Sequence, residues 1–145
     1  PVQRPHLPIW LGGGHTNVLR RAITTADGWM GAGASSNADF KERVLRIKDM
    51  LEETGRDPKS FTISKRIYIS VDTDESRALD RLRAWSGGVY RNPGLADEVA
   101  VWGSPQKCAE ILNEVASIGV DHLLLNPLFD FQEQLEALSE ISHSM

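Results

Sequence analysis

Short apolar runs alternate with amphipathic stretches along most of the chain. Four of these runs have the length and composition of β-strands, and after each of them apolar residues recur at helical spacing. The predicted strands are residues 8–11, 29–31, 61–71 and 122–126. The predicted helices lie at 16–25, from 36 or 37 to 55, after 72–75, from 104 to 119 and from 130 onward. Such alternation favours an α/β fold with a parallel sheet.

The second predicted helix illustrates the pattern. Phe40, Val44, Ile47 and Leu51 fall on one stripe, at steps of four, three and four residues. A Ser-Asn pair just before the stripe supplies a helix cap, and Gly55 is a typical helix terminator. We therefore expect this helix to bury one face against the sheet.

Four strand–helix units limit the possible architectures. Parallel strands need helical crossovers, which are right-handed. Four such units form either a small open sheet or one half of a (β/α)8 TIM barrel, a fold that typically needs about 250 residues. No linker, low-complexity tract or change of composition divides residues 1–145, so we expect a single domain.

Composition and charge are those of an ordinary globular domain, with 41% hydrophobic residues, 25% charged residues and a net charge of −4. The chain has no basic stripe, so neither nucleic acid nor a membrane is an expected partner, and its apolar runs are too short to cross a bilayer. The single cysteine, Cys108, lies on the apolar face of a predicted helix, where we expect a buried hydrophobe and not a nucleophile.

The histidines are scattered along the chain, so we expect no metal site. With no signal peptide visible, the cytoplasm is the expected compartment.

Candidate chemistry begins where the first predicted strand ends in three glycines, Gly12 to Gly14, just before a helix that starts at Thr16. Glycine has no Cβ, so a bound group can approach the backbone closely. The N–H groups of a first helical turn have no internal partner and carry partial positive charge. Together these features predict a phosphate seat. The alternative is a tight turn that merely avoids Cβ clashes.

Three motifs resemble the second half of the bacterial luciferase-like oxidoreductases. They are the Ile-Trp-Leu-Gly-Gly-Gly strand and turn at 9–14 with the segments at 19–22 and 26–29, the Val-Trp-Gly-Ser-Pro segment at 101–105, and the strand at 119–126. They occur in the family's order across nearly the whole chain. The resemblance implies a (β/α)8 barrel, of which this chain is the C-terminal half. It also implies a redox coenzyme, either FMN or the 5-deazaflavin analogue that carries hydride.

The resemblance further implies that the family's first four strands are absent. Those strands carry much of the ring pocket and usually the catalytic histidine or acid, so no catalytic residue is assigned here. The chain opens with Pro-Val-Gln-Arg-Pro at 1–5 and has no initial methionine, which favours a fragment of a longer enzyme. A half barrel exposes two strand edges and half a core. We therefore expect the missing N-terminal half or a second copy as partner, a homo-oligomer, and a chain that is inactive alone.

By resemblance, the coenzyme phosphate lies at the turn after the first strand and close to the end of the second. The expected coenzyme-binding residues are Gly12, Gly13, Gly14, His15, Thr16, Asn17, Trp29, Met30 and Gly31. Trp29 fits the barrel core equally well. The expected substrate contacts are Tyr90 and Asn126, which ends the last strand on the active face. Asn126 before Pro127 also fits a simple turn.

Two further features remain open in the sequence. Tyr90 belongs to a Gly-rich segment, residues 85–102, which we interpret as a substrate lid or a disordered loop. In the third strand, alternation places Lys65 on one side and Arg66 with Tyr68 on the other. One of the two charges could hold an anion inside the barrel. The favoured interpretation is a solvated or ion-paired position near the entry end of the strand.

The leading hypothesis is an oxidoreductase, a luciferase-like monooxygenase or dehydrogenase, that uses FMN or a 5-deazaflavin coenzyme on a small organic substrate. The alternative is a non-catalytic half barrel that dimerises and binds a phosphorylated ligand. A third interpretation is a small open α/β fold of another family, with a phosphosugar at the switch point of its strand order.

Overall fold

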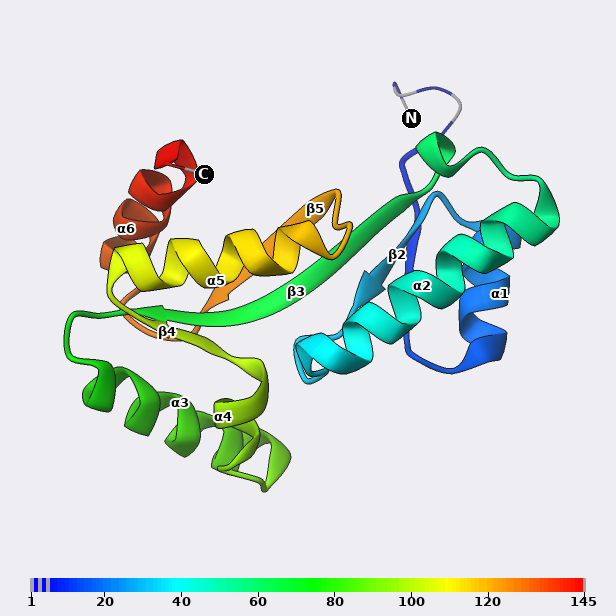
Figure 1. Cartoon of the computed structure of the whole chain (residues 1–145). Helices are drawn as coiled ribbons and strands as arrows, with labels where there is room; N and C mark the ends of the chain where they lie inside the picture. The colour runs from blue at the N-terminus through cyan, green and yellow to red at the C-terminus, as the bar shows by residue number, and fades with distance from the viewer. Residues whose placement is uncertain (1, 3, 5, 145) are drawn as a thin grey trace.

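The computed structural model describes residues 2, 4 and 6–144 and shows strands and helices that alternate along the chain (Figure 1). Pro1, Gln3, Pro5 and Met145 lie outside the described residues, and the first three belong to the opening segment on which the fragment hypothesis drew. In chain order the elements are β1 (Trp10–Gly12), α1 (Thr16–Thr25), β2 (Gly28–Gly31), α2 (Asn37–Thr54), the 3₁₀ turn η1 (Pro58–Ser60), β3 (Thr62–Val71), α3 (Glu75–Tyr90), α4 (Leu95–Val99), β4 (Val101–Gly103), α5 (Pro105–Ser117), β5 (His122–Pro127) and α6 (Phe131–Ser144). The four predicted strands are confirmed, and β4 is a fifth, short strand.

All five strands are parallel, and β3 is their central member. β1 pairs with β2, and β2 pairs with residues 62–65 of β3. β5 pairs with residues 64–69 of β3 along the opposite edge, so β4, which pairs with residues 69–71, lies on the same edge as β2. Among the described strands, residues 66–68 of β3 therefore have no partner on that edge, in a gap between the end of β2 and the start of β4.

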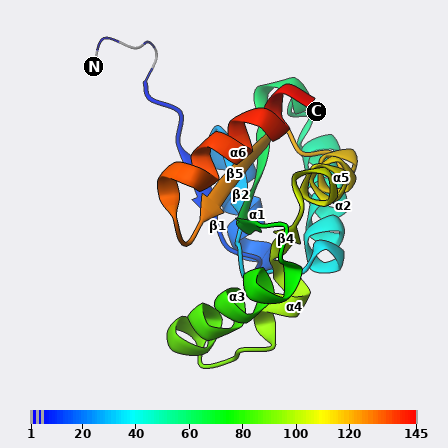
Figure 2. The same cartoon turned by 90° about the vertical axis from the view of Figure 1, so that its left-hand side faces the viewer.

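Side-chain alternation gives the sheet two unlike faces. One face carries apolar side chains such as Ile63, Ile67 and Ile69 and is covered by helices. α1 and α2 seal one core over β1, β2 and the start of β3, and α5 and α6 seal a second core over the rest of β3 with β4 and β5. Figure 1 shows α1 and α2 at one end of β3, and Figure 2 shows α3 and α4 together at the opposite end of the molecule from α6.

We call the opposite side of the sheet the inner face, and it is polar along β3. Register and alternation place on it the side chains of Trp10, Met30, Ser64, Arg66, Tyr68, Ser70, His122, Leu124 and Asn126. α3 approaches this face at Tyr68, whose ring centre lies 4.7 Å from that of Trp85. The two faces thus separate the packed cores from the polar groups.

The segment at residues 85–102 is largely regular structure, so the disordered-loop interpretation is wrong, whereas a role as a substrate lid stays a prediction. α3 continues to Tyr90, α4 covers 95–99, and β4 follows at 101–103. Two glycines lie inside α3, where each costs about 1 kcal/mol relative to alanine. Packing outweighs this cost, because Ser86 is buried and its hydroxyl donates to the carbonyl oxygens of Arg83 and Pro93. The helix ends at Arg91, which adopts a left-handed conformation with φ of 55°.

Two aspartates join neighbouring strands at the amino-terminal edge of the sheet. Asp27 precedes β2, and its carboxylate accepts from the Ile9 amide at 2.7 Å while its own amide donates to the Ile9 carbonyl. Asp121 precedes β5 and forms the same pair of bonds with Ile63, whose amide lies 2.8 Å from the carboxylate. Each carboxylate accepts a hydrogen bond from a backbone amide that strand pairing leaves without a partner. The two aspartates thereby fix the residue at which β2 and β5 begin to pair with their neighbouring strands.

Replacing Asp121 with alanine tests this role. Asp121→Ala leaves the buried Ile63 amide without its acceptor, so the free energy of unfolding should fall by about 1–3 kcal/mol. The matched control is Glu114→Ala on the exposed side of α5, for which we expect a change within about 0.5 kcal/mol. Urea denaturation followed by circular dichroism measures both. Equal stability of the two variants would contradict the role.

Candidate functional site

The inner face contains a hollow of about 290 Å³ where β1 and β2 end. Its walls combine glycine backbone, three large apolar side chains and one guanidinium. The lining residues are Trp10, Gly12, Gly13, Met30, Gly31, Ala32, Arg66 and Leu124. The carboxyl ends of parallel strands are the usual position of ligand sites in α/β folds. The hollow is therefore the first candidate for a binding site.

The glycine turn after β1 forms the rim of this hollow. Gly13 has a φ of 117°, and its carbonyl accepts from the Trp29 indole nitrogen at 2.7 Å, which holds the turn in place. His15 caps α1 through its Nδ1, which accepts from the Asn17 amide at 3.2 Å. Within the described part of the chain, the amides of Gly14, His15 and Thr16 donate no hydrogen bond. These exposed donors are available to an anion.

Two arginines of α2 reach the same turn. Arg46 donates to the Thr16 hydroxyl at 2.9 Å and pairs with Glu42 at 2.8 Å. Arg43 lies so close to Gly14 that a Cβ there would stand 2.5 Å from its Nε. Among the described residues, Arg43 has neither an ion pair nor a hydrogen bond. A half-buried, uncompensated guanidinium beside free amides favours binding of a phosphate-like anion.

Three buried polar atoms lack partners in the described residues, and all three belong to inner-face side chains. They are the Trp10 Nε1, the Ser64 Oγ and the Arg66 Nε. Arg66 makes one hydrogen bond, from Nη2 to the Tyr68 hydroxyl at 2.7 Å. A buried donor without an acceptor costs about 1–3 kcal/mol. The inner face thus carries unsatisfied polar groups while the helix-covered face is well packed.

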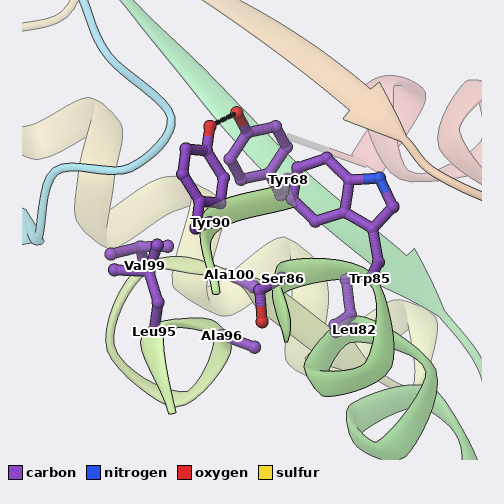
Figure 3. Close-up of a pocket in the computed structure, with 9 residues that line it drawn as sticks. All are labelled: Tyr68, Leu82, Trp85, Ser86, Tyr90, Leu95, Ala96, Val99 and Ala100. Carbon is purple, nitrogen blue, oxygen red and sulfur yellow. Dashed lines mark hydrogen bonds between the residues drawn. The ribbon is translucent and has the colours of Figure 1, made fainter. Parts of the chain in front are cut away.

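An aromatic cluster adjoins Arg66 at the gap in the sheet edge. The hydroxyl oxygens of Tyr68 and Tyr90 lie 2.5 Å apart, and Trp85 packs beside both rings (Figure 3). Burial, followed by this hydrogen bond, raises the pKa of Tyr68 to about 12, so its phenol stays protonated at neutral pH. The cavity between the cluster and α4 measures about 10 Å³, room for about one water molecule. The cluster is a packed contact and not a ligand pocket.

Apart from Trp29, the structure divides the predicted site residues into three groups. Four line the hollow, namely Gly12, Gly13, Met30 and Gly31. Four form the turn at its rim, namely Gly14, His15, Thr16 and Asn17. Tyr90 and Asn126 lie away from the hollow lining, near Tyr68, because Tyr90 contacts Tyr68 and Asn126 is its register partner on β5. The Asn126 amide donates to the carbonyl of Pro127 at 3.3 Å.

Trp29 requires a correction. Its side chain lies on the helix-covered face, is 1% exposed and stacks on Phe40 with ring centres 5.6 Å apart. It therefore belongs to the core and supports the turn through Gly13, without lining the hollow. Alternation explains the difference, because Met30 takes the inward position in this short strand.

The expected solvated position of the two charges in β3 is also wrong. Lys65 is 1% exposed within the helix-covered side, where its Nζ donates to the Ser35 carbonyl at 2.9 Å and lies over the Phe40 ring. Burial, followed by the charge of Arg43, lowers the pKa of Lys65 to about 8. Arg66 is half-buried on the inner face. Cys108, by contrast, is fully buried as predicted, and burial raises the pKa of its thiol to about 11.

The sequence patterns did not point to Trp10, Ala32, Arg43 or Leu124, and they offered an anion-holding Arg66 only as the less favoured interpretation. The period-two pattern of β3 carried the signal for Arg66, since it shares a face with Tyr68 and not with the isoleucines. Arg43 gave no signal, because a helix arginine next to an apolar stripe is usually solvated. Its role depends on how α2 packs against the glycine turn.

Among the described residues, no helix combines the length and the apolar character needed to cross a membrane.

Comparison with known proteins adds three findings. The sequence model of the luciferase-like monooxygenase family matches residues 1–96. An F420-dependent glucose-6-phosphate dehydrogenase of Mycolicibacterium gilvum (strain PYR-GCK) is 27% identical over 81 residues, which are 55% of this chain and 24% of that protein. The chain therefore spans about a quarter of this curated relative.

Solved structures show the same fold. Flavoprotein 390 superposes with a TM-score of 0.80 at 12% identity, covering 93% of this chain and 64% of its own. An F420-dependent secondary alcohol dehydrogenase, solved with an F420-acetone adduct, superposes with a TM-score of 0.72 at 17% identity, covering 86% of this chain and 44% of its own. An EDTA monooxygenase from Chelativorans sp. BNC1 superposes with a TM-score of 0.67 at 13% identity, covering 90% of this chain and 42% of its own. The predicted partial (β/α)8 barrel is thereby confirmed, and the open α/β fold of another family is excluded.

The lowered pKa of Lys65 leads to a test by pH. Its folded-state pKa of about 8 lies below its ordinary value of 10.5, so the unfolded chain binds more protons between these values and stability rises with pH there. The free energy of unfolding of the wild type, minus that of Lys65→Met, should rise by up to about 3 kcal/mol from pH 8 to 10.5. The opposite effect of Cys108 above pH 9 cancels in this difference. A flat difference would contradict the assignment.

Proposed function

The chain belongs to the luciferase-like monooxygenase family, and from this premise we propose that its glycine turn and hollow form part of the coenzyme site of an oxidoreductase. The enzyme would use FMN or a 5-deazaflavin coenzyme on a small organic substrate. The observation that carries the proposal is the pairing of free amides at Gly14, His15 and Thr16 with the uncompensated Arg43.

A phosphate fits this turn for physical reasons. The Thr16 amide opens α1 and the amides of Gly14 and His15 lie just before it, at the end of the helix where the dipole adds partial positive charge. Gly14 leaves Arg43 close to the backbone, which a side chain at that position would prevent. Thr16 contributes a hydroxyl that Arg46 already holds in place at 2.9 Å. One anionic group could therefore accept from backbone, side chain and guanidinium together.

The hollow beside the turn suits the remainder of the coenzyme. Gly12 and Gly13 bring bare backbone to its rim, and Trp10 and Met30 supply apolar surface for a flat ring system. When bound, the coenzyme supplies the redox chemistry. The residues of this chain bind its phosphate, orient the ring and exclude water on one side. FMN and phosphorylated 5-deazaflavins share the phosphate on which the proposal rests, and relatives of both the dehydrogenase and the monooxygenase kind share the fold.

We further propose that another barrel half, or a second copy of the chain, completes the sheet. In the described residues β1 pairs with β2 alone and β5 pairs with β3 alone, so each presents an open edge. Leu124 on the inner face is 40% exposed, and Phe131 and Leu135 on α6 are 63% and 61% exposed. Such open edges and apolar side chains are typical of an interface. The same observation supports the second candidate, a non-catalytic dimer that binds a phosphorylated ligand.

Coenzyme binding tests the first proposal. We expect the full-length protein to bind FMN or a 5-deazaflavin 5′-phosphate, and to bind riboflavin, which lacks the phosphate, far more weakly. Arg43→Gln should weaken binding of the phosphorylated coenzyme about tenfold to a hundredfold, as expected for one charge-assisted hydrogen bond, and leave riboflavin unchanged. The control is Arg83→Gln, because Arg83 pairs with Asp97 on the surface. Fluorescence titration measures all of these. Equal affinity for riboflavin and FMN would overturn the phosphate seat.

Mass in solution tests the partner. Light scattering on the chain alone should give at least twice its 16.1 kDa. Leu135→Lys should weaken this association, because it places a charge on the exposed face of α6. The matched control is Leu45→Lys at an exposed position of α2, which should leave the association unchanged. A stable dimer that binds phosphate but shows no redox activity would favour the binding module. A monodisperse monomer would contradict the dimer and leave the missing barrel half as the partner.

A further inference from the structure

Arg66 occupies an unusual position for a charged residue. It lies in the middle of β3 on the inner face, at the gap between the end of β2 and the start of β4. Arg66 lines the hollow together with Trp10, Met30 and Leu124. Central strand positions rarely carry a charge without a partner. The hollow therefore contains one fixed positive charge.

No carboxylate compensates this charge among the described residues. Arg77, Arg81 and Arg83 each pair with an aspartate at 2.8, 2.5 and 2.5 Å. Arg66 has no ion pair, and its hydrogen bond goes to the neutral phenol of Tyr68. Its Nη1 makes no hydrogen bond within the described residues either, and unlike the Nε this nitrogen is at least partly accessible to solvent. A partly desolvated guanidinium in this state favours an anionic ligand.

The surroundings hold the guanidinium in one orientation. A guanidinium can only donate, so the Tyr68 oxygen accepts its hydrogen bond, and Tyr68 is in turn linked to Tyr90 of α3 at 2.5 Å. Gly33 packs against the other side, where a Cβ would lie 2.8 Å from the Tyr68 ring and 3.1 Å from the Arg66 Nε. Arg66 is thus preorganised before any ligand arrives, which lowers the entropic cost of binding.

From this arrangement, and resting on the proposed function, we infer that Arg66 binds the anionic group of the substrate, a carboxylate on an otherwise apolar organic molecule. The planar guanidinium fits a carboxylate, and Leu124, the register partner of Arg66 on β5, offers apolar surface to the rest of such a molecule. One cation balances one negative charge. The more highly charged phosphate of the coenzyme has its own seat, at the amides of the glycine turn and at Arg43.

Benzoate and its neutral isostere benzamide are suitable probes, titrated into the full-length protein. The readout is the chemical shift of the Arg66 Nε–H and Trp10 Nε1–H signals in nitrogen-15 spectra, assigned by their absence in Arg66→Lys and Trp10→Phe. We expect benzoate to shift both signals saturably and benzamide to bind at least about tenfold more weakly. Benzamide binding as tightly as benzoate would overturn the inference.

Variants separate charge from geometry. Arg66→Gln should abolish benzoate binding, and Arg66→Lys, which keeps the charge but loses the planar fork, should weaken it about tenfold. Tyr68→Phe removes the hydroxyl that orients Arg66 and should weaken benzoate binding with the charge intact. Arg83→Gln is the surface control and should bind benzoate like the wild type. Unchanged benzoate affinity in a folded Arg66→Gln protein would overturn the inference. Failure of the wild type to bind benzoate would also overturn it, and would indicate that a carboxylate of the full-length protein already pairs with Arg66.

The two proposals fail differently. FMN and 5-deazaflavin phosphate are titrated into the same variants, and coenzyme affinity should follow Arg43 while benzoate affinity follows Arg66. Coenzyme binding without Arg66-dependent benzoate binding would overturn the present inference and leave the proposed function standing. Arg66-dependent benzoate binding without coenzyme binding would overturn the proposed function, while the carboxylate site would remain.

Discussion

Strand β3 is the element on which the rest of the structure depends. Within the described residues it is the strand that pairs with three others, and its ten residues contribute to both hydrophobic cores. Strict alternation along it directs isoleucine and valine side chains toward the helices and Ser64, Arg66, Tyr68 and Ser70 toward the inner face. A register shift of one residue would exchange these faces. The bonds of Asp121 to Ile63 fix where β5 begins beside it.

Local signals in the sequence predicted the parts of the fold that local forces determine. α1 spans the expected residues, Ser36 caps α2 by accepting from the Asp39 amide, and Gly55 ends it with φ of 64°. Elements stabilised by distant contacts were harder to predict. β4 has three residues and exists because it pairs with the far end of β3, and α3 continues through two glycines because Ser86 and Tyr90 pack against partners elsewhere in the chain.

The candidate site shows the same division. The glycine turn was predictable because backbone freedom and a helix start are encoded in adjacent residues. Arg43 joins it from α2, a contact that only tertiary packing creates. Lys65 and Arg66 differ in their surroundings because neighbouring residues of a strand point to opposite faces, and only the face that carries Lys65 is covered by helices. Lys65 is tolerated in the core because its Nζ finds the Ser35 carbonyl, whereas Arg66 is left with an unsatisfied Nε.

The hydrogen-bonded chain from Arg66 through Tyr68 to Tyr90 joins the hollow to α3, which is otherwise remote from it. Thermodynamic linkage makes such a connection reciprocal. Whatever holds the guanidinium also restrains the tyrosines and, through them, the helix pair α3 and α4. If the hollow binds the anion proposed above, disorder in that pair would therefore weaken the binding. The α3–α4 segment would then contribute to affinity, although it contributes no side chain to the wall of the hollow.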